Sequence, residues 1–132
     1  MDLLLIIVII LVSLFITIQL WAYIKSKKLA GKKIPFDEID EEIAEEIKDK
    51  TGLIYFFSPR CHNCKIQSPI IEDIKKSYKN IISIDASKNI NIARTFNIMG
   101  TPSILIFSGN KIMGYFVGIK KKLFIEKQLN SN

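Results

Sequence analysis

Cys61 and Cys64 are the only cysteines among the 132 residues of the chain, and two residues separate them. An apolar run at residues 53–57 precedes the pair, and apolar residues at helical spacing follow it. The pair is therefore expected where a buried strand ends and a helix begins. Helix N-terminal N–H groups stabilise an anion, so the Cys61 thiol should ionise more readily than a free cysteine. This placement favours thiol–disulfide chemistry.

Other chemistries fit the same residues less well. A closed zinc site needs four ligands, and the chain offers only Cys61, His62 and Cys64 as soft ligands. No metal site is predicted, although a zinc ion shared between two chains stays open. Haem attachment requires a histidine directly after the second cysteine, and Lys65 occupies that position. A purely structural disulfide would close a very short loop and remove little chain entropy.

The first part of the chain predicts a membrane span. Residues 3–24 are apolar apart from one serine, one threonine and one glutamine. As a helix they would extend about 33 Å, close to the roughly 30 Å hydrocarbon core of a bilayer. A cleaved signal peptide is the alternative, but it requires a basic segment before a shorter apolar core. We therefore expect residues 1–24 to form a single, retained transmembrane anchor.

Five lysines follow the apolar run at Lys25, Lys27, Lys28, Lys32 and Lys33. Residues 25–33 are interpreted as a basic juxtamembrane linker, and residues 34–132 as the globular domain. The positive-inside rule places that domain on the cytoplasmic side, with the extracytoplasmic side as the alternative.

The chain carries a formal net charge of +6. Its lysine clusters, at residues 25–33 and 120–122, contain no aromatic residues on which bases could stack. Lysines beside a membrane suit anionic lipid headgroups. We therefore expect the lipid bilayer, and no nucleic acid, as a partner.

Hydrophobic periodicity predicts alternating strands and helices after the linker. The expected strands are at residues 34–36, 53–57, 81–85, 103–107 and 111–117. A helix capped by Asp37 should end at Gly52, and further helices should run from the cysteine motif to about residue 79 and over residues 89–96 and 120–129. The strand–helix–strand unit implies parallel pairing and the final hairpin antiparallel pairing, so the sheet should be mixed.

With these elements placed, residues 34–130 resemble the thioredoxin family. The matching motifs are Tyr55-Phe56-Phe57-Ser58 before Cys61-x-x-Cys64-Lys65, then Pro69, Ile84-Asp85, Gly100-Thr101-Pro102 and Gly118. A lone Cys-x-x-Cys motif is a weak signal, but this ordered set is specific. The resemblance implies an α/β thioredoxin fold, with a central mixed sheet flanked by helices and, here, an N-terminal transmembrane helix.

The resemblance implies a protein-disulfide oxidoreductase in which Cys61 is the exposed nucleophile and Cys64 the buried resolving thiol. Protein disulfides would be its substrates, and an unidentified dithiol its electron donor or acceptor. The disulfide itself would be the redox group, without a cofactor. A cis bond is implied before Pro102, with the backbone of Thr101 and Pro102 pairing with the substrate polypeptide.

Two alternatives to a reductase stay open. The same groove could serve a non-enzymatic peptide-docking or chaperone module. The protein would instead be an oxidant or isomerase if the domain faces the extracytoplasmic side.

The residues around the cysteines depart from the common pattern of the family, which places Gly-Pro between them or a histidine just before the second. Here His62 and Asn63 lie between them, and Arg60 precedes the first. A cationic His62 would stabilise the Cys61 thiolate and make the pair more oxidising; a solvent-facing His62 would have little effect. Arg60 adds positive charge near the thiolate or is a surface residue.

A second departure lies six residues before Cys61, where Tyr55 replaces the buried aspartate of thioredoxins. The position of the usual lysine partner aligns with Ile81. Loss of both is physically consistent, because one buried charge left alone costs roughly 3–5 kcal/mol. In the family this aspartate is thought to help deprotonate the resolving thiol, so its absence predicts slower resolution by Cys64 than in ordinary thioredoxins.

Overall fold

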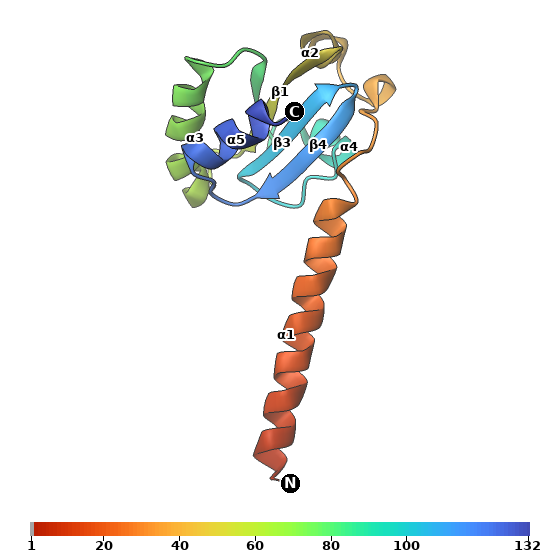
Figure 1. The fold of residues 1–132 in the computed structure, drawn as a ribbon, viewed down its shortest axis with the longest axis vertical. Coiled ribbons are helices and arrows are strands. Elements are labelled where there is room, and N and C mark those ends of the chain that lie inside the picture. The colour runs from red at the N-terminus through yellow and green to blue at the C-terminus, as the bar shows by residue number, and fades with distance from the viewer. Residues whose placement is uncertain (1) are drawn as a thin grey trace.

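The computed structural model describes residues 2–132, except the side chains of Ala22, Lys25 and Ser26. Met1 of the predicted anchor and the Lys25 side chain of the predicted linker therefore lie outside the described residues. A long helix projects from an α/β domain (Figure 1). The helices are α1 (Leu3–Lys27), α2 (Glu41–Ile47), α3 (His62–Lys75), α4 (Ile90–Thr95) and α5 (Lys122–Asn130). The strands are β1 (Lys50–Phe57), β2 (Ile81–Asp85), β3 (Ser103–Gly109) and β4 (Lys111–Val117).

Helix α1 extends away from the domain along most of its length (Figure 1). Its segment Leu3–Trp21 has a mean hydropathy of 3.1, and none of this segment is buried. The segment is long and apolar enough to cross a bilayer, and a signal sequence shares these properties. The helix continues to Lys27, so the beginning of the predicted linker is helical.

The four strands form one mixed sheet in the order β2-β1-β3-β4. Strand β1 pairs with β2 in parallel and with β3 antiparallel, and β3 and β4 form the predicted hairpin. The central position of β1 explains its apolar run, because a strand covered on both faces needs apolar side chains in both directions.

Helices cover both faces of the sheet, and alternate residues of β1 point to opposite faces. Ile54 and Phe56 belong to one core, which includes Ile47 of α2 and Ile92 of α4. The other core contains Leu53 and Tyr55 of β1, Ile71 and Ile74 of α3, and Ile125 and Leu129 of α5. Helix α3, which carries the cysteine motif, is thus fixed against β1 by packing along its length.

The prediction that the helix after Asp37 ends at Gly52 is wrong. Helix α2 ends at Ile47, and Gly52 lies within β1. A Cβ atom at Gly52 would overlap the carbonyl oxygen of Asn80 and lie 2.8 Å from Cζ of Phe107. The glycine allows this close approach, through which the Leu53 N–H donates to the Asn80 carbonyl at 3.1 Å.

Other elements also differ from those expected. The strand expected at residues 34–36 is reduced to a single bridge between Lys33 and Lys111, followed by a 3₁₀ turn at Phe36–Glu38. The first helix is preceded by Asp40 at its N-cap, rather than Asp37. Helix α3 ends at Lys75, several residues early. Local propensity is a weak guide to such ends, because tertiary context overrides it.

Replacing Gly52 by alanine should lower the free energy of unfolding by about 1–3 kcal/mol, because the added methyl group overpacks the junction of β1 with Asn80. Urea unfolding of the full chain in detergent, monitored by circular dichroism, measures this loss in the free energy of unfolding. Gly100→Ala is the matched control, since nothing lies within 4 Å of a Cβ at that position. Equal stability of the two variants would contradict the close-approach explanation.

Candidate active site

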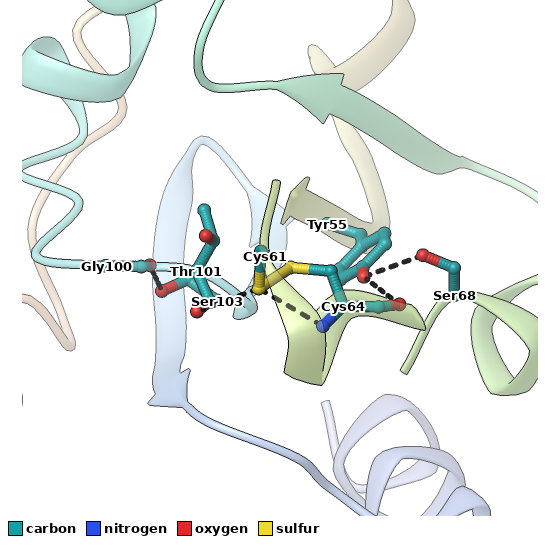
Figure 2. Close-up of a disulfide and its surroundings, with 7 residues drawn as sticks. All are labelled: Tyr55, Cys61, Cys64, Ser68, Gly100, Thr101 and Ser103. Atoms are coloured by element: carbon teal, nitrogen blue, oxygen red, sulfur yellow. Dashed lines mark hydrogen bonds between the residues drawn. A yellow bond between two sulfur atoms is a disulfide. The ribbon is translucent and has the colours of Figure 1, made fainter. Parts of the chain in front are cut away.

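Cys61 and Cys64 lie at the junction of β1 and α3, as the sequence predicts. Cys61 is the N-cap residue of α3, and its sulfur accepts a hydrogen bond from the backbone N–H of Cys64 at 3.1 Å. The two cysteines form a disulfide with their Cα atoms 5.2 Å apart (Figure 2). The N–H donor and the helix N-terminus both favour a negative charge on the Cys61 sulfur after reduction.

The two sulfur-bearing residues differ in access to solvent. Cys64 is 3% exposed, whereas Cys61 is half-buried. A disulfide on another protein can therefore approach Cys61 more easily than Cys64. This difference is the one that an attacking thiol and a resolving thiol require.

The loop before β3 lies directly against Cys61. The Thr101–Pro102 peptide bond is cis, as the resemblance implies. The Thr101 carbonyl oxygen lies 3.3 Å from the Cys61 sulfur (Figure 2). In the disulfide this sulfur carries no hydrogen, but after reduction the Cys61 thiol can donate to that carbonyl. The Pro102 carbonyl is already engaged, since it accepts from the N–H of Gly118 at 2.8 Å.

A chain of hydroxyl groups holds this loop in place. The Met99 N–H donates to the Tyr115 hydroxyl at 3.1 Å, which lies 3.2 Å from the Ser103 hydroxyl. The Ser103 hydroxyl donates its only proton to the Gly100 carbonyl at 2.5 Å, so the Tyr115 hydroxyl must donate to Ser103. The turn just before Thr101 is thus bound at both its N–H and its carbonyl.

Neither Tyr115 nor Ser103 is predicted from the sequence to be part of the site. Both are buried, with exposures of 5% and 0%, and both lie in strands where they look like core residues. Their link is a cross-strand relation in the β3–β4 hairpin, which a polar residue inside each apolar run could have signalled.

A second buried polar side chain connects α3 with the segment after β4. Gln67 is fully buried, and its side-chain amide pairs with the backbone of Lys120. The Lys120 N–H donates to the Gln67 carbonyl oxygen at 2.6 Å, and the Gln67 amide donates to the Lys120 carbonyl at 3.2 Å. These two hydrogen bonds fix Lys120 relative to the active-site helix.

Tyr55 lies beneath the cysteine pair, with 2% of its surface exposed. Its hydroxyl is 2.9 Å from the Ser68 hydroxyl and donates to the Cys64 carbonyl at 3.4 Å (Figure 2). Burial raises the pKa of the Tyr55 phenol, although the hydrogen bond with Ser68 offsets part of the rise. Tyr55 therefore stays neutral at physiological pH and provides a donor rather than a base.

The three residues predicted to tune the thiols, Arg60, His62 and Asn63, are all exposed. They lie around the first turn of α3, and their effect on the reduction potential stays a prediction. Among the described residues, no group of three or more His, Cys, Asp or Glu side chains could hold a metal ion.

Comparison with known proteins agrees with this architecture. The thioredoxin family model matches residues 32–131, so the chain belongs to the thioredoxin family. Thioredoxin from Buchnera aphidicola subsp. Schizaphis graminum is 32% identical over 98 residues, which cover 70% of this chain and 91% of that protein. Thioredoxin from Buchnera aphidicola subsp. Baizongia pistaciae is 36% identical over 84 residues, or 61% and 77% of the two chains.

Solved structures share the fold. Schistosoma mansoni thioredoxin superposes with a TM-score of 0.62 at 24% identity, over 69% of this chain and 84% of that one. Oxidised mitochondrial thioredoxin 3 from Saccharomyces cerevisiae gives the same TM-score at 17% identity, over 70% and 88% of the two chains. The thioredoxin fold predicted from the sequence is therefore confirmed.

Replacing Tyr115 by phenylalanine should lower the pKa of Cys61 in the reduced protein. The loop loses its clamp, the Thr101 carbonyl can retreat, and a hydrogen bond that favours the neutral thiol weakens. One such bond is worth roughly 0.5–1.5 kcal/mol, or about half a pKa unit to one unit. The ultraviolet absorbance of the thiolate, measured against pH, reports the shift.

Tyr78→Phe is the matched control for this substitution, because its hydroxyl bonds with Asn130 on the surface, away from the cysteines. A Cys61 pKa that is unchanged or raised in the Tyr115→Phe variant would contradict the role of the clamp.

Proposed function

We propose that the protein is a membrane-tethered thiol–disulfide oxidoreductase that reduces protein disulfides. The observation that carries the proposal is the asymmetry of the cysteine pair. Cys61 is accessible and receives a backbone N–H at the start of α3, whereas Cys64 is buried one turn further on. Membership of the thioredoxin family supports the same chemistry.

The reaction proceeds by two thiol–disulfide exchanges. The Cys61 thiolate attacks one sulfur of the target disulfide, a Cys61–target bond forms, and the other target sulfur leaves as a thiolate and takes up a proton. The Cys64 thiol then releases its proton and attacks the Cys61 sulfur, and the first target sulfur leaves as a thiolate that is protonated in turn. Two electrons pass to the target, and the Cys61–Cys64 disulfide is left.

A dithiol donor must reduce this disulfide before the next cycle. The direction of net transfer depends on the reduction potential of the pair against that of its compartment. On the cytoplasmic side, where thiols are kept reduced, the protein acts as a reductase. On the extracytoplasmic side the same pair would serve as an oxidant or isomerase.

Binding of the target backbone is assigned to the loop of Thr101 and Pro102. The position of the loop supports this assignment, because the Thr101 carbonyl lies 3.3 Å from the Cys61 sulfur. A target strand paired with this loop would bring its own sulfur to Cys61. The clamp formed by Tyr115 and Ser103 keeps the loop ready for this pairing without further ordering on binding.

Reduction of insulin disulfides by the full chain in detergent tests the activity. With dithiothreitol as the donor, the wild type should accelerate insulin precipitation, and Cys61→Ser should fall to the rate of dithiothreitol alone. In a separate reaction without dithiothreitol, pre-reduced Cys64→Ser should instead accumulate a mixed disulfide through Cys61, visible as a shift on a non-reducing gel.

The two cysteine variants control for one another, since each removes one sulfur from the same turn. Acceleration that persists in Cys61→Ser would contradict the mechanism. Binding of insulin without its reduction, equal in wild type and Cys61→Ser, would favour the peptide-docking alternative.

The tether and its orientation rest on the apolar α1 helix and on the lysines that follow it. In a Cys61→Ser/Cys64→Ser background, a cysteine at position 123 reports the location of the domain, because Leu123 is 79% exposed. On intact cells, a membrane-impermeant maleimide should label Leu123→Cys only after lysis. Labelling before lysis would place the domain outside, and recovery of the protein in the soluble fraction would overturn the tether.

A further inference from the structure

A groove of about 830 Å³ lies between α1 and the edge strand β4. Helix α1 contributes Gln19, Tyr23 and Lys27, which are spaced four residues apart and so lie on one face of the helix. The domain contributes, among others, Met99, Met113 and Lys120. The lining is mostly apolar, with a lysine from each side.

The groove borders the candidate active site. Met99 lies two residues before Thr101, whose carbonyl approaches the Cys61 sulfur. The N–H of Met99 donates to the Tyr115 hydroxyl. Lys120 follows the Gly118 that bonds Pro102 and is itself held by Gln67 on α3. A chain lying in the groove would therefore lead directly to the reactive sulfur.

The position of Gln19 sets the level of the groove relative to a membrane. Gln19 lies inside the apolar segment Leu3–Trp21, about 3 Å along the axis from its end. Tyr23 and Lys27 follow on the same face, with the Lys27 ammonium 4.8 Å from the centre of the Tyr23 ring. Tyrosine and lysine are the residues that favour the interface between hydrocarbon and water. The groove therefore opens at the bilayer surface.

The orientation of the sheet is consistent with a groove that opens at the bilayer surface. Strand β4 runs toward the end of the domain from which α1 departs (Figure 1). The Gly100–Pro102 loop meets Gly118 just beyond the end of β4. The active-site end of the sheet thus faces the same side as the transmembrane helix.

The outer edge of β4 is only partly paired. Its beginning is covered, since the Gly31 N–H donates to the Ile112 carbonyl at 2.6 Å and the Ile112 N–H to the Lys32 carbonyl at 2.9 Å. Beyond Ile112, no other strand of the described chain pairs with this edge. Met113 and Val117 line the groove along this stretch, and each is 41% exposed.

An unpaired edge beside an apolar groove suits an extended polypeptide, whose backbone bonds to the edge and whose side chains enter the groove. The flexible thioethers of Met99 and Met113 can adapt to different apolar side chains.

We propose that the substrates of the protein are disulfides in polypeptides anchored to the same membrane, whose juxtamembrane segment lies in the groove between α1 and β4. This inference rests on the proposed function and specifies its substrate class. The partner segment emerges from the bilayer beside α1, follows the free edge of β4 and presents its disulfide to Cys61. Sharing a membrane also raises the effective concentration of such a substrate.

Single-turnover reduction in phosphatidylcholine liposomes tests the inference with the full, pre-reduced chain. Three probes carry the same disulfide-closed peptide: one is soluble, one follows a transmembrane helix after a short apolar spacer, and one follows the same helix after a long Gly/Ser spacer. The short-spacer probe should react fastest, by about tenfold or more over the long-spacer probe. Met113→Glu should remove this advantage and leave the rate with the soluble probe unchanged.

Ile90→Glu is the matched control, because Ile90 is 52% exposed and does not line the groove. Equal rates for short and long spacers, or an advantage that survives Met113→Glu, would overturn the inference and assign the groove to lipid. An equal loss with all three probes in Met113→Glu would also overturn it. If the pre-reduced wild type reduces none of the probes, the proposed function itself fails.

Discussion

The hydrogen bond from the Cys64 N–H to the Cys61 sulfur is the interaction on which the site depends. It exists because only a short turn, residues 58–61, separates the end of β1 from the start of α3, so that the first cysteine takes the place of a capping residue. A capping oxygen accepts from the same unpaired N–H groups, and a sulfur in that place gains the stabilisation that a thiolate needs. The core on both faces of β1 holds this junction rigid, so packing and reactivity are coupled.

Around that junction, neutral polar side chains hold the backbone of the site in place through hydrogen bonds. Tyr55 and Gln67 bind the backbone of α3 and of the segment after β4, and Tyr115 and Ser103 bind the loop before Pro102. Each of these side chains is buried, and each has a hydrogen-bond partner. A buried neutral group with a partner is far less costly than a buried charge without one. Among the described residues, neutral hydrogen-bonding groups therefore position the site.

Local pattern was sufficient for much of this architecture. The order of strands and helices, the mixed sheet and the placement of the cysteine pair follow from periodicity and from motif spacing. Gly52 was misread because a glycine after an acidic helix signals a helix end as well as a close approach, and only the position of Asn80 distinguishes the two. The hydroxyl chain was not predicted, because the polar residues inside the apolar runs of β3 and β4 show only that a partner is needed, and the contact of Tyr115 with Met99 depends on the path of the loop before β3.

The connection between α1 and the domain is short and is bonded to β4. Hydrogen bonds from Gly31 and Ile34 to Ile112 and Asn110 leave little free chain after Lys27. Such a joint transmits rotation instead of absorbing it. A change in the direction of α1 would therefore turn the whole domain and reorient the Cys61 sulfur.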